Sequence, residues 1–319
     1  MNTINPTSNG LVLIADEMHL SIVPMLEQIG YIADYQPLIK RQELIEMMGN
    51  YTGLIIRSKT IVDEELLQNA TQLKFIGRAG AGLDLIDNEV VTKKNIQVFA
   101  ANEGNKVAVA EHIIGMLLCL FHKILVADKQ VRNGVWLREE NRGYELNGKT
   151  VGIIGYGNNG SETAKRLKAF GCKILAFDKF KTNFGDEFVQ ESSMEIIFEE
   201  ADIVSLHIPL TDESSKMVNA AYLNKFKKNI YLLNASRGEM VVLNDLAEAL
   251  ESGKVCGACL DVLENEKLQK LTPQQQEIFT KLTNSDRVIL TPHIAGWTFE
   301  SYIKINEVLI EKIKLAQIF

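Results

Sequence analysis

The stretch TVGIIGYGNNGSETAKRL, residues 150–167, decides the fold of this chain. Its apolar start predicts a buried strand, and Gly155, Gly157 and Gly160 then form a GxGxxG pattern that opens an amphipathic helix. In that context the first glycine permits a tight turn, the second lets the backbone approach a pyrophosphate, and the third lets the helix pack closely on the strand. The amides and dipole of the helix N-terminus favour phosphate. The stretch therefore predicts a dinucleotide-binding unit, with a glycine turn of another α/β fold as the alternative.

The apolar run that follows, KILAF at residues 173–177, ends in Asp178, 23 residues after Gly155. A carboxylate at this place accepts hydrogen bonds from the ribose hydroxyls of a dinucleotide. It would also repel the additional ribose phosphate of NADP. The spacing therefore predicts NAD as the cofactor.

Strand-length runs rich in Val, Ile and Leu recur along the chain, separated by amphipathic stretches. Near-continuous apolar runs of this kind are typical of parallel strands covered by helices on both faces. The runs are residues 11–16, 53–58, 75–80, 97–101, 150–155, 173–178, 203–208, 230–236, 256–262 and 287–292. Because they fall into an early and a late set, we expect an α/β protein with two doubly wound parallel sheets.

Helical patterns lie between these runs. From Asn105 to Asn133 apolar residues recur at helical spacing, which predicts one long helix between the two sets of strands. Thr272 and Gln275 have the spacing of a capping box, with Pro273 at the first helical position, which predicts a further short helix.

The composition excludes several classes of protein. With 319 residues, 46% of them hydrophobic and 24% charged, the chain is long and apolar enough for two packed domains. Its net charge of −7 gives no basic surplus for binding nucleic acid. Residues 1–10 are a polar lead-in without the pattern of a secretory signal, and ionisable residues interrupt the most apolar segment, residues 107–127. We therefore expect a cytoplasmic protein that neither enters a membrane nor binds nucleic acid.

The four cysteines, Cys119, Cys172, Cys256 and Cys259, are too few for a disulfide framework in a chain of this length, and they fit a reducing compartment. Cys256 and Cys259 have CxxC spacing. They lie in an apolar run that predicts a strand, however, and no second pair exists, so no metal site is predicted.

Three ionisable residues of the second half, Arg237, Glu266 and His293, each stand just past an apolar run. Because ligands of open α/β sheets bind beyond the carboxyl ends of the strands, these residues are candidates for one catalytic site. The arginine would grip a carboxylate or polarise a carbonyl, the histidine would transfer a proton, and the glutamate would orient the imidazole. From position alone, a surface cation, a solvated carboxylate and a structural histidine remain the alternative.

With these motifs the chain resembles the D-2-hydroxyacid dehydrogenases over most of its length. The matching segments follow the order of that family. They are GRAGAGLDLID (77–87), GNKVAVAEH (104–112), ELNGKTVGIIGYG (145–157), HIPLT (207–211), NASRGE (234–239), LDVLENE (260–266) and TPHIAG (291–296). The resemblance implies the same three catalytic residues and hydride transfer to NAD.

The resemblance also implies the domain organisation. A Rossmann-type NAD domain, residues 103–293, would be inserted in a flavodoxin-like substrate domain, residues 1–102 and 294–319, with the active site in the cleft. The family forms homodimers, and the apolar stripe of Val107, Ile113, Leu117 and Phe121 is a candidate interface. A place in the intramolecular core is the alternative for this stripe.

Further residues are assigned by the motif and the resemblance together. The cofactor-binding candidates are Gly155, Tyr156, Gly157, Asn158, Asn159, Gly160, Asp178, His207, Pro209, Thr211, Ala235, Ser236, Arg237, Asp261, His293 and Gly296. Asp261 would face the nicotinamide amide, with packing at the strand end as the alternative for Asp261 and His207. The substrate-binding candidates are Arg57, Ser58, Arg78, Ala79, Gly80, Ala81, Gly82 and Asn105. Arg138 is a weaker candidate, because it would act on the substrate of a neighbouring subunit.

The implied reaction is the NAD-dependent oxidation of 3-phospho-D-glycerate to 3-phosphooxypyruvate in serine biosynthesis. Reduction of glyoxylate or hydroxypyruvate stays open, since Arg57 and Arg78 could bind a plain carboxylate as well as a phosphate. A formate dehydrogenase is disfavoured, because that branch has glutamine where Glu266 stands. A remote alternative is an NAD-sensing binding protein similar to the corepressors of this fold.

The chain departs from the family pattern at four positions. Lys267 replaces the usual proline after Glu266, Trp297 replaces a glycine, and Asn158 and Asn159 replace an arginine and an isoleucine. These changes put the loop after Glu266, the surroundings of His293 and the cofactor affinity in doubt. The printed chain stops at residue 319, so the regulatory C-terminal domain of the longer members is not expected.

Overall fold

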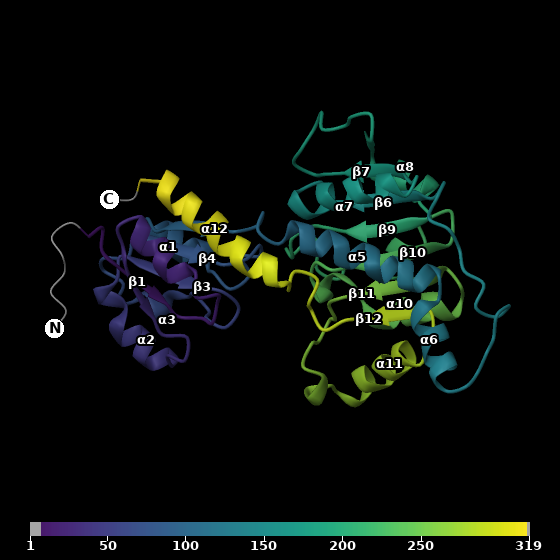
Figure 1. Cartoon of the computed structure of the whole chain (residues 1–319), viewed down its shortest axis with the longest axis horizontal. Helices are drawn as coiled ribbons and strands as arrows, with labels where there is room; N and C mark the ends of the chain where they lie inside the picture. Colours follow the sequence, from purple (N-terminus) through teal and green to yellow (C-terminus); the bar gives the residue numbers. More distant parts are fainter. Residues whose placement is uncertain (1–7, 318–319) are drawn as a thin grey trace. The chain divides into compact units, whose positions relative to one another are not determined.

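The computed structural model describes residues 8–317, so most of the expected polar lead-in lies outside the described residues. The chain divides into two compact units (Figure 1). The first comprises the described residues up to Asn105 together with those from Trp297 onward, and the second is Lys106–Gly296. Each unit has its own parallel sheet.

The sheet of the first unit has five parallel strands in the order β2-β1-β3-β4-β5. This is the flavodoxin-like order. The strands are β1 (Leu11–Ile14), β2 (Ile32–Tyr35), β3 (Gly53–Ile56), β4 (Phe75–Arg78) and β5 (Gln97–Ala100). The helices are α1 (Ile22–Gln28), α2 (Arg41–Met47), α3 (Glu64–Leu67), α4 (Asn88–Lys93) and α12 (Phe299–Leu315), with the 3₁₀ turn η1 (Met48–Asn50).

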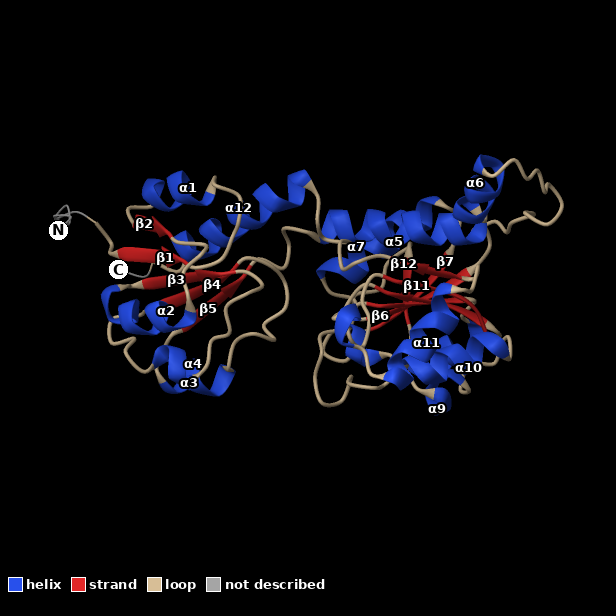
Figure 2. Cartoon of the chain, turned by 90° about the horizontal axis from the view of Figure 1, so that it is seen from below, coloured by secondary structure: helices blue, strands red, loops and turns tan. Residues whose placement is uncertain are grey.

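Both faces of this sheet are covered by helices (Figure 2). Val12 and Ile14 of β1 pack with α1 and α12, whereas Leu13 between them packs on the opposite face with α2 and α3. Successive strand residues point to opposite faces, and here both faces are buried. This explains why the strands are continuous apolar runs rather than alternating ones.

The sheet of the second unit has seven parallel strands in the order β12-β11-β10-β9-β6-β7-β8. This is the Rossmann order, extended by one strand. The strands are β6 (Thr150–Ile154), β7 (Lys173–Phe177), β8 (Val189–Glu191), β9 (Ile203–Leu206), β10 (Ile230–Asn234), β11 (Val255–Leu260) and β12 (Val288–Leu290). The helices and 3₁₀ turns are α5 (Lys106–Phe121), α6 (Ile124–Arg132), α7 (Asn158–Ala169), α8 (Met194–Glu200), α9 (Ala220–Leu223), η2 (Gly238–Met240), α10 (Leu243–Glu251), η3 (Leu268–Lys270) and α11 (Pro273–Thr283).

Helices again cover both faces, with α5 and α7 on one and α9, α10 and α11 on the other (Figure 2). The predicted fold class of two doubly wound parallel sheets is confirmed. All ten predicted strands exist, and Cys256 and Cys259 lie on one of them, β11. The capping box of α11 is also present, since the amide of Gln275 donates to Thr272 Oγ1 at 3.2 Å.

Two strands were not predicted, and both lie at a sheet edge. β2 has the sequence IADY and is only partly buried, and β8 is the three-residue strand VQE, of which only Val189 is buried. An edge strand has a neighbour on one side only, so it does not require the continuous apolar run by which the inner strands were recognised.

The prediction of one long helix from Asn105 to Asn133 is wrong. The segment forms α5 and α6, bent by 61° at Lys123, whose φ of 51° is left-handed. The carbonyl of Phe121, which a continuous helix would bond to residue 125, instead accepts from the amide of Tyr144 at 2.9 Å. The segment around Tyr144 thus takes the place of the next helical turn as the partner of the last carbonyl of α5.

The interface predicted for the apolar stripe of this segment is also wrong for three of its four residues. Ile113, Leu117 and Phe121 are buried in the core of the second unit, and only Val107 is exposed. Among the described residues, no single helix is long and apolar enough to cross a bilayer, and α5 and α6 reach that length only together.

Candidate active site

The glycine loop between β6 and α7 has the geometry that a dinucleotide requires. Gly155 has a φ of +94°, and a Cβ there would lie 2.5 Å from the carbonyl oxygen of His207. A Cβ on Gly160 would lie 2.0 Å from the carbonyl oxygen of Gly155. A Cβ on Gly157, in contrast, would meet nothing within 4 Å. Gly155 and Gly160 are thus required by packing. Gly157 leaves open space at the N-terminus of α7, where a pyrophosphate fits.

Asp178 at the end of β7 fixes this loop. Its carboxylate accepts from the amide of Tyr156 at 2.8 Å, from that of Phe180 at 2.9 Å and from that of Lys181 at 3.1 Å. A carboxylate has about four lone-pair positions, so it can accept a further bond from a ribose hydroxyl. The ring of Tyr156 stacks on Phe184 at 4.6 Å beside this turn.

The two asparagines that depart from the family pattern begin α7. Asn158 is its first residue. The side-chain oxygen of Asn159 is buried and has no hydrogen-bond partner within the described part of the chain. The structure gives no account of how either replacement changes the affinity for a pyrophosphate.

The segment after β9 lies against the same loop. The amide of His207 donates to the carbonyl of Ile154 at 2.7 Å, and its Nε2 lies 2.8 Å from Ser205 Oγ. Burial lowers the pKa of the His207 imidazole to about 4, so the ring is neutral at pH 7. Ser214 Oγ, 2.8 Å from both the carbonyl of Pro209 and the amide of Thr211, fixes the turn that carries these two candidates.

The loop after β10 carries Arg237 and is held by a buried asparagine. Asn234 Nδ2 donates to the carbonyl of Arg237 at 2.9 Å, and Asn234 Oδ1 accepts from the amide of Ser236 at 3.0 Å. Ala235, which lies between Asn234 and Ser236 in the chain, packs against the core. A Cβ on Gly238 would lie 1.9 Å from the carbonyl oxygen of Leu263, so this loop lies directly against the one that leads to Glu266.

Asp261 at the end of β11 organises the TPHIAG segment. It is 1% exposed, and its carboxylate accepts from Thr291 Oγ1 at 2.6 Å, the amide of Ile294 at 2.9 Å and the amide of Ala295 at 2.8 Å. His112 Nε2 lies 3.0 Å from Thr291 Oγ1. These bonds support the alternative of packing at the strand end, because they engage both carboxylate oxygens of Asp261.

His293 lies next to Glu266, as the sequence predicted. Its Nδ1 is 3.1 Å from Glu266 Oε2, and both side chains are about half exposed. Its φ of 56° is left-handed, an uncommon conformation for a non-glycine residue that the surrounding structure must hold in place. The amide of His293 donates to the carbonyl of Asp261 at 2.7 Å, which contributes to that constraint. The carboxylate orients the imidazole through Nδ1, so that Nε2 is the ring nitrogen outside this contact.

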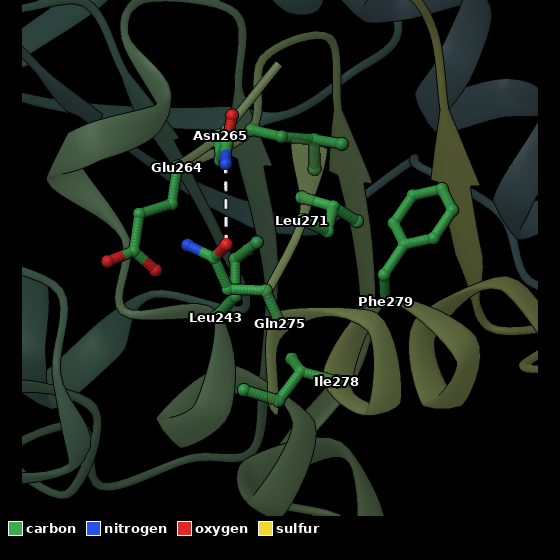
Figure 3. Close-up of a pocket in the computed structure, with 8 residues that line it drawn as sticks. Leu243, Glu264, Asn265, Leu271, Gln275, Ile278 and Phe279 are labelled. Atoms are coloured by element: carbon green, nitrogen blue, oxygen red, sulfur yellow. Dashed lines mark hydrogen bonds between the residues drawn. The ribbon is translucent and has the colours of Figure 1, made fainter. Parts of the chain in front are cut away.

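The loop that carries Glu266, in which Lys267 follows the glutamate, is held by hydrogen bonds (Figure 3). Asn265 Oδ1 accepts from the amide of Lys267 at 3.0 Å, and Asn265 Nδ2 donates to Gln275 Oε1 at 3.3 Å. The same Gln275 oxygen accepts from the amide of Thr272 at 3.0 Å. Apolar side chains from the loop, α10 and α11 line a pocket beside the bond between Asn265 and Gln275. They are Leu243, Leu263, Leu271, Ile278 and Phe279. The hydrogen bond between Asn265 and Gln275 therefore joins the loop that carries Glu266 to α11.

The substrate-binding candidates belong to the first unit. Arg57 and Ser58 follow β3, in a turn whose amides bond to the buried carboxylate of Asp16. Burial alone would raise the pKa of Asp16. The hydrogen bonds from Thr60 and from the turn amides outweigh that effect and hold the pKa below its ordinary value.

Arg78 ends β4, and its guanidinium folds back over the next turn. Nη1 donates to the carbonyl of Ala79 at 3.1 Å. Gly80 has a φ of +152°, a backbone conformation that favours glycine, and a Cβ there would displace the Arg78 guanidinium, whose Nη1 would lie 1.4 Å away. Ala79 and Gly80 are buried, whereas Ala81 and Gly82 are partly exposed. The side-chain oxygen of Asn105 is buried and has no partner within residues 8–317.

The residues that hold the candidates in place were not predicted from the sequence. Asn234, Thr291 and His112 stood inside quoted segments, and Asp16 ends the first apolar run. A buried polar residue at a strand end was the available signal, because such a group must find partners in the adjoining turns. Arg138 lies in an exposed loop of the second unit.

These features define a dinucleotide-binding α/β protein of the dehydrogenase class. The sequence profile of the family described as "D-isomer specific 2-hydroxyacid dehydrogenase, NAD binding domain" matches residues 114–295. The chain belongs to this family. The predicted family is thereby confirmed, and so is NAD as its cofactor, since the matched region is the NAD-binding domain of the family.

Similar proteins carry several names. A D-3-phosphoglycerate dehydrogenase from Archaeoglobus fulgidus is 36% identical over 304 residues, which are 95% of this chain and 56% of that protein. A hydroxypyruvate reductase from Thermotoga maritima is 36% identical over 277 residues, 86% of this chain and 88% of that protein. The crystal structure of a glyoxylate reductase from Paecilomyes thermophila superposes with a TM-score of 0.84 at 25% identity and covers 98% of this chain and 96% of its own. The chain thus spans about half the length of the phosphoglycerate dehydrogenase but most of the two reductases.

Proposed function

We propose that this chain transfers hydride between NAD and the C2 position of a D-2-hydroxy acid. The observation that carries the proposal is the His293–Glu266 pair, held in a left-handed turn beyond the carboxyl end of a strand of the NAD-binding sheet. We assign residues 103–293 to the NAD domain and residues 1–102 and 294–319 to the substrate domain.

In this mechanism each residue of the second unit has one task. His293 Nε2 accepts the hydroxyl proton during oxidation and returns it to the carbonyl oxygen during reduction. The Glu266 carboxylate stabilises the imidazolium that exists while His293 carries this proton. The Arg237 guanidinium binds the substrate carboxylate through its planar set of donors. The glycine loop, Asp178 and the amides at the start of α7 would hold NAD, which supplies the hydride acceptor.

The substrate that we propose is 3-phospho-D-glycerate, and the product is 3-phosphooxypyruvate, as in serine biosynthesis. Arg57 and Arg78 support this choice, because two guanidinium groups at the ends of neighbouring strands of the first unit suit a group with two negative charges. The second candidate is reduction of hydroxypyruvate, favoured by the nearly full-length match to a hydroxypyruvate reductase. Both reactions use the same three catalytic residues.

Substrate preference is the test of this proposal. Oxidation of NADH by the purified protein is followed with 3-phosphooxypyruvate, hydroxypyruvate and glyoxylate at matched concentrations. We expect kcat/KM to be about 10- to 100-fold higher for the phosphorylated acid, because it gains charge-assisted hydrogen bonds. Equal or better turnover of the unphosphorylated acids would make the chain a general 2-oxo acid reductase. Failure to turn over any of the three would favour an NAD-sensing binding protein instead.

We also propose that the protein is a cytoplasmic homodimer. Exposed apolar side chains gather on α6, where Ile124 is 48%, Leu125 is 54% and Val131 is 51% exposed. A surface of this kind is typical of a subunit interface. Sedimentation at micromolar protein should give twice the chain mass of 35.7 kDa, and replacement of Ile124 and Leu125 by aspartate should give the monomer. A monomeric unaltered protein would contradict the proposal.

A further inference from the structure

In the first unit the guanidinium of Arg57 lies against two aromatic rings. Its central carbon is 3.9 Å from the ring centroid of Trp297 and 5.1 Å from that of Tyr302. The two rings are 4.9 Å apart and inclined at 51°. His19 packs edge-on against Tyr302 at 5.8 Å. The aromatic stack is thus made from residues that lie far from Arg57 in the sequence.

Arg57 makes two further hydrogen bonds, one from its backbone amide and one from the guanidinium itself. Its amide donates to Asp16 Oδ2 at 2.6 Å, and Nη1 donates to the carbonyl of Glu17 at 3.3 Å. An arginine side chain has many rotamers in water, and the aromatic stack together with the bond to Glu17 removes some of them. The guanidinium is therefore restricted in its rotamers before any ligand arrives.

The stack also decides how an anion approaches Arg57. The Trp297 ring lies against the guanidinium, and it is 50% exposed, so it extends from the protein surface beside the charge. An anion is thereby directed to the N–H edge of the guanidinium. Approach along the edge gives two parallel hydrogen bonds to a carboxylate or a phosphate, which is the strong geometry for this pair.

We propose that Trp297 is a positioning residue for substrate specificity: with Tyr302 it holds the Arg57 guanidinium as a rigid receptor for the anionic group of the substrate. The inference rests on the proposed function and adds to it a residue that acts on substrate binding rather than on the chemical step.

The kinetic test uses a matched pair of variants. Trp297→Leu keeps an apolar side chain and removes the aromatic face, whereas Trp297→Phe keeps the face. We expect Trp297→Leu to raise KM for 3-phosphooxypyruvate about tenfold with kcat within about twofold, and Trp297→Phe to restore most of the affinity. An unchanged KM in Trp297→Leu, or a loss confined to kcat, overturns the proposal.

A double-mutant cycle then asks whether Trp297 acts through Arg57. In an Arg57→Met background, Trp297→Leu should have no further effect on KM, because the group that it positions is gone. Additive effects of the two replacements would assign Trp297 a direct contact of its own and overturn the positioning role.

Binding without turnover separates this inference from the proposed function. The chain has two tryptophans, so Trp136→Phe leaves Trp297 as the only indole. Titration of that variant with inorganic phosphate, in the absence of NADH, should change the Trp297 emission in a saturable way, and Arg57→Met should abolish the change. If no 2-oxo acid is reduced but the emission still responds, the proposed function fails and the receptor stands. If the emission does not respond, the receptor is overturned whatever the turnover.

Discussion

Replacing His293 with asparagine should lower kcat for the reduction of a 2-oxo acid by about 10²- to 10⁴-fold and leave the Kd for NADH within about twofold. In the proposed mechanism the histidine supplies the proton, whereas the glycine loop and Asp178 hold most of the dinucleotide, so the two quantities should separate. Asparagine is the chosen replacement because position 293 has a φ of 56°, and asparagine tolerates the left-handed region better than other non-glycine residues. Steady-state kinetics gives kcat, and the change in NADH fluorescence on binding gives Kd.

The control for His293 is Arg237→Lys, which keeps a positive charge and loses the planar set of donors. It should raise KM for the oxo acid more than it lowers kcat, because lysine binds a carboxylate as a point charge. If His293→Asn retains kcat, the histidine is not the proton donor. If it loses NADH binding to the same extent as turnover, the variant has disturbed the Asp261 turn rather than the chemistry.

Replacing Asp178 with serine should reduce the preference for NADH over NADPH, expressed as the ratio of the two kcat/KM values, by about 100-fold. The carboxylate repels a ribose phosphate and also occupies the amides of Phe180 and Lys181. Its removal frees those amides for the phosphate, and Lys181, whose Nζ donates to the carbonyl of Tyr156 at the same turn, adds positive charge. The ratio is measured with the two reduced cofactors at a saturating concentration of the oxo acid.

Asp186→Ser is the matched control for Asp178. Asp186 lies in the same unit and also accepts from two turn amides, those of Phe188 and Val189, at 2.7 and 2.8 Å. Its replacement should lower the free energy of unfolding by about 1 kcal/mol, as the loss of such a bond does elsewhere. It should not change the cofactor ratio. An equal change of the ratio in both variants would assign Asp178 a structural role alone.

The elements that the sequence predicted well are those recognised by local pattern. The inner strands are buried on both faces, so their composition alone identifies them. The glycine loop, the end of β7 and the capping box of α11 each depend on residues within a few positions of one another, and the structure contains all three. The contact of His293 with Glu266 also followed from the sequence, because both residues stand beyond the carboxyl ends of parallel strands, which meet at one edge of a sheet.

The sequence by itself therefore determined the fold class and the positions of the candidate site along the chain. Tertiary structure decided the break at Lys123, where the Phe121 carbonyl bonds to Tyr144, and the burial of Ile113 and Leu117 in the core. It also decided the stack of Trp297 on Arg57, which joins residues 240 positions apart. Periodicity and spacing report what the backbone does over a few turns. The distant group that bonds to a given carbonyl or carboxylate, or stacks on a given guanidinium, depends on how the elements pack. It is therefore fixed only when the chain has folded.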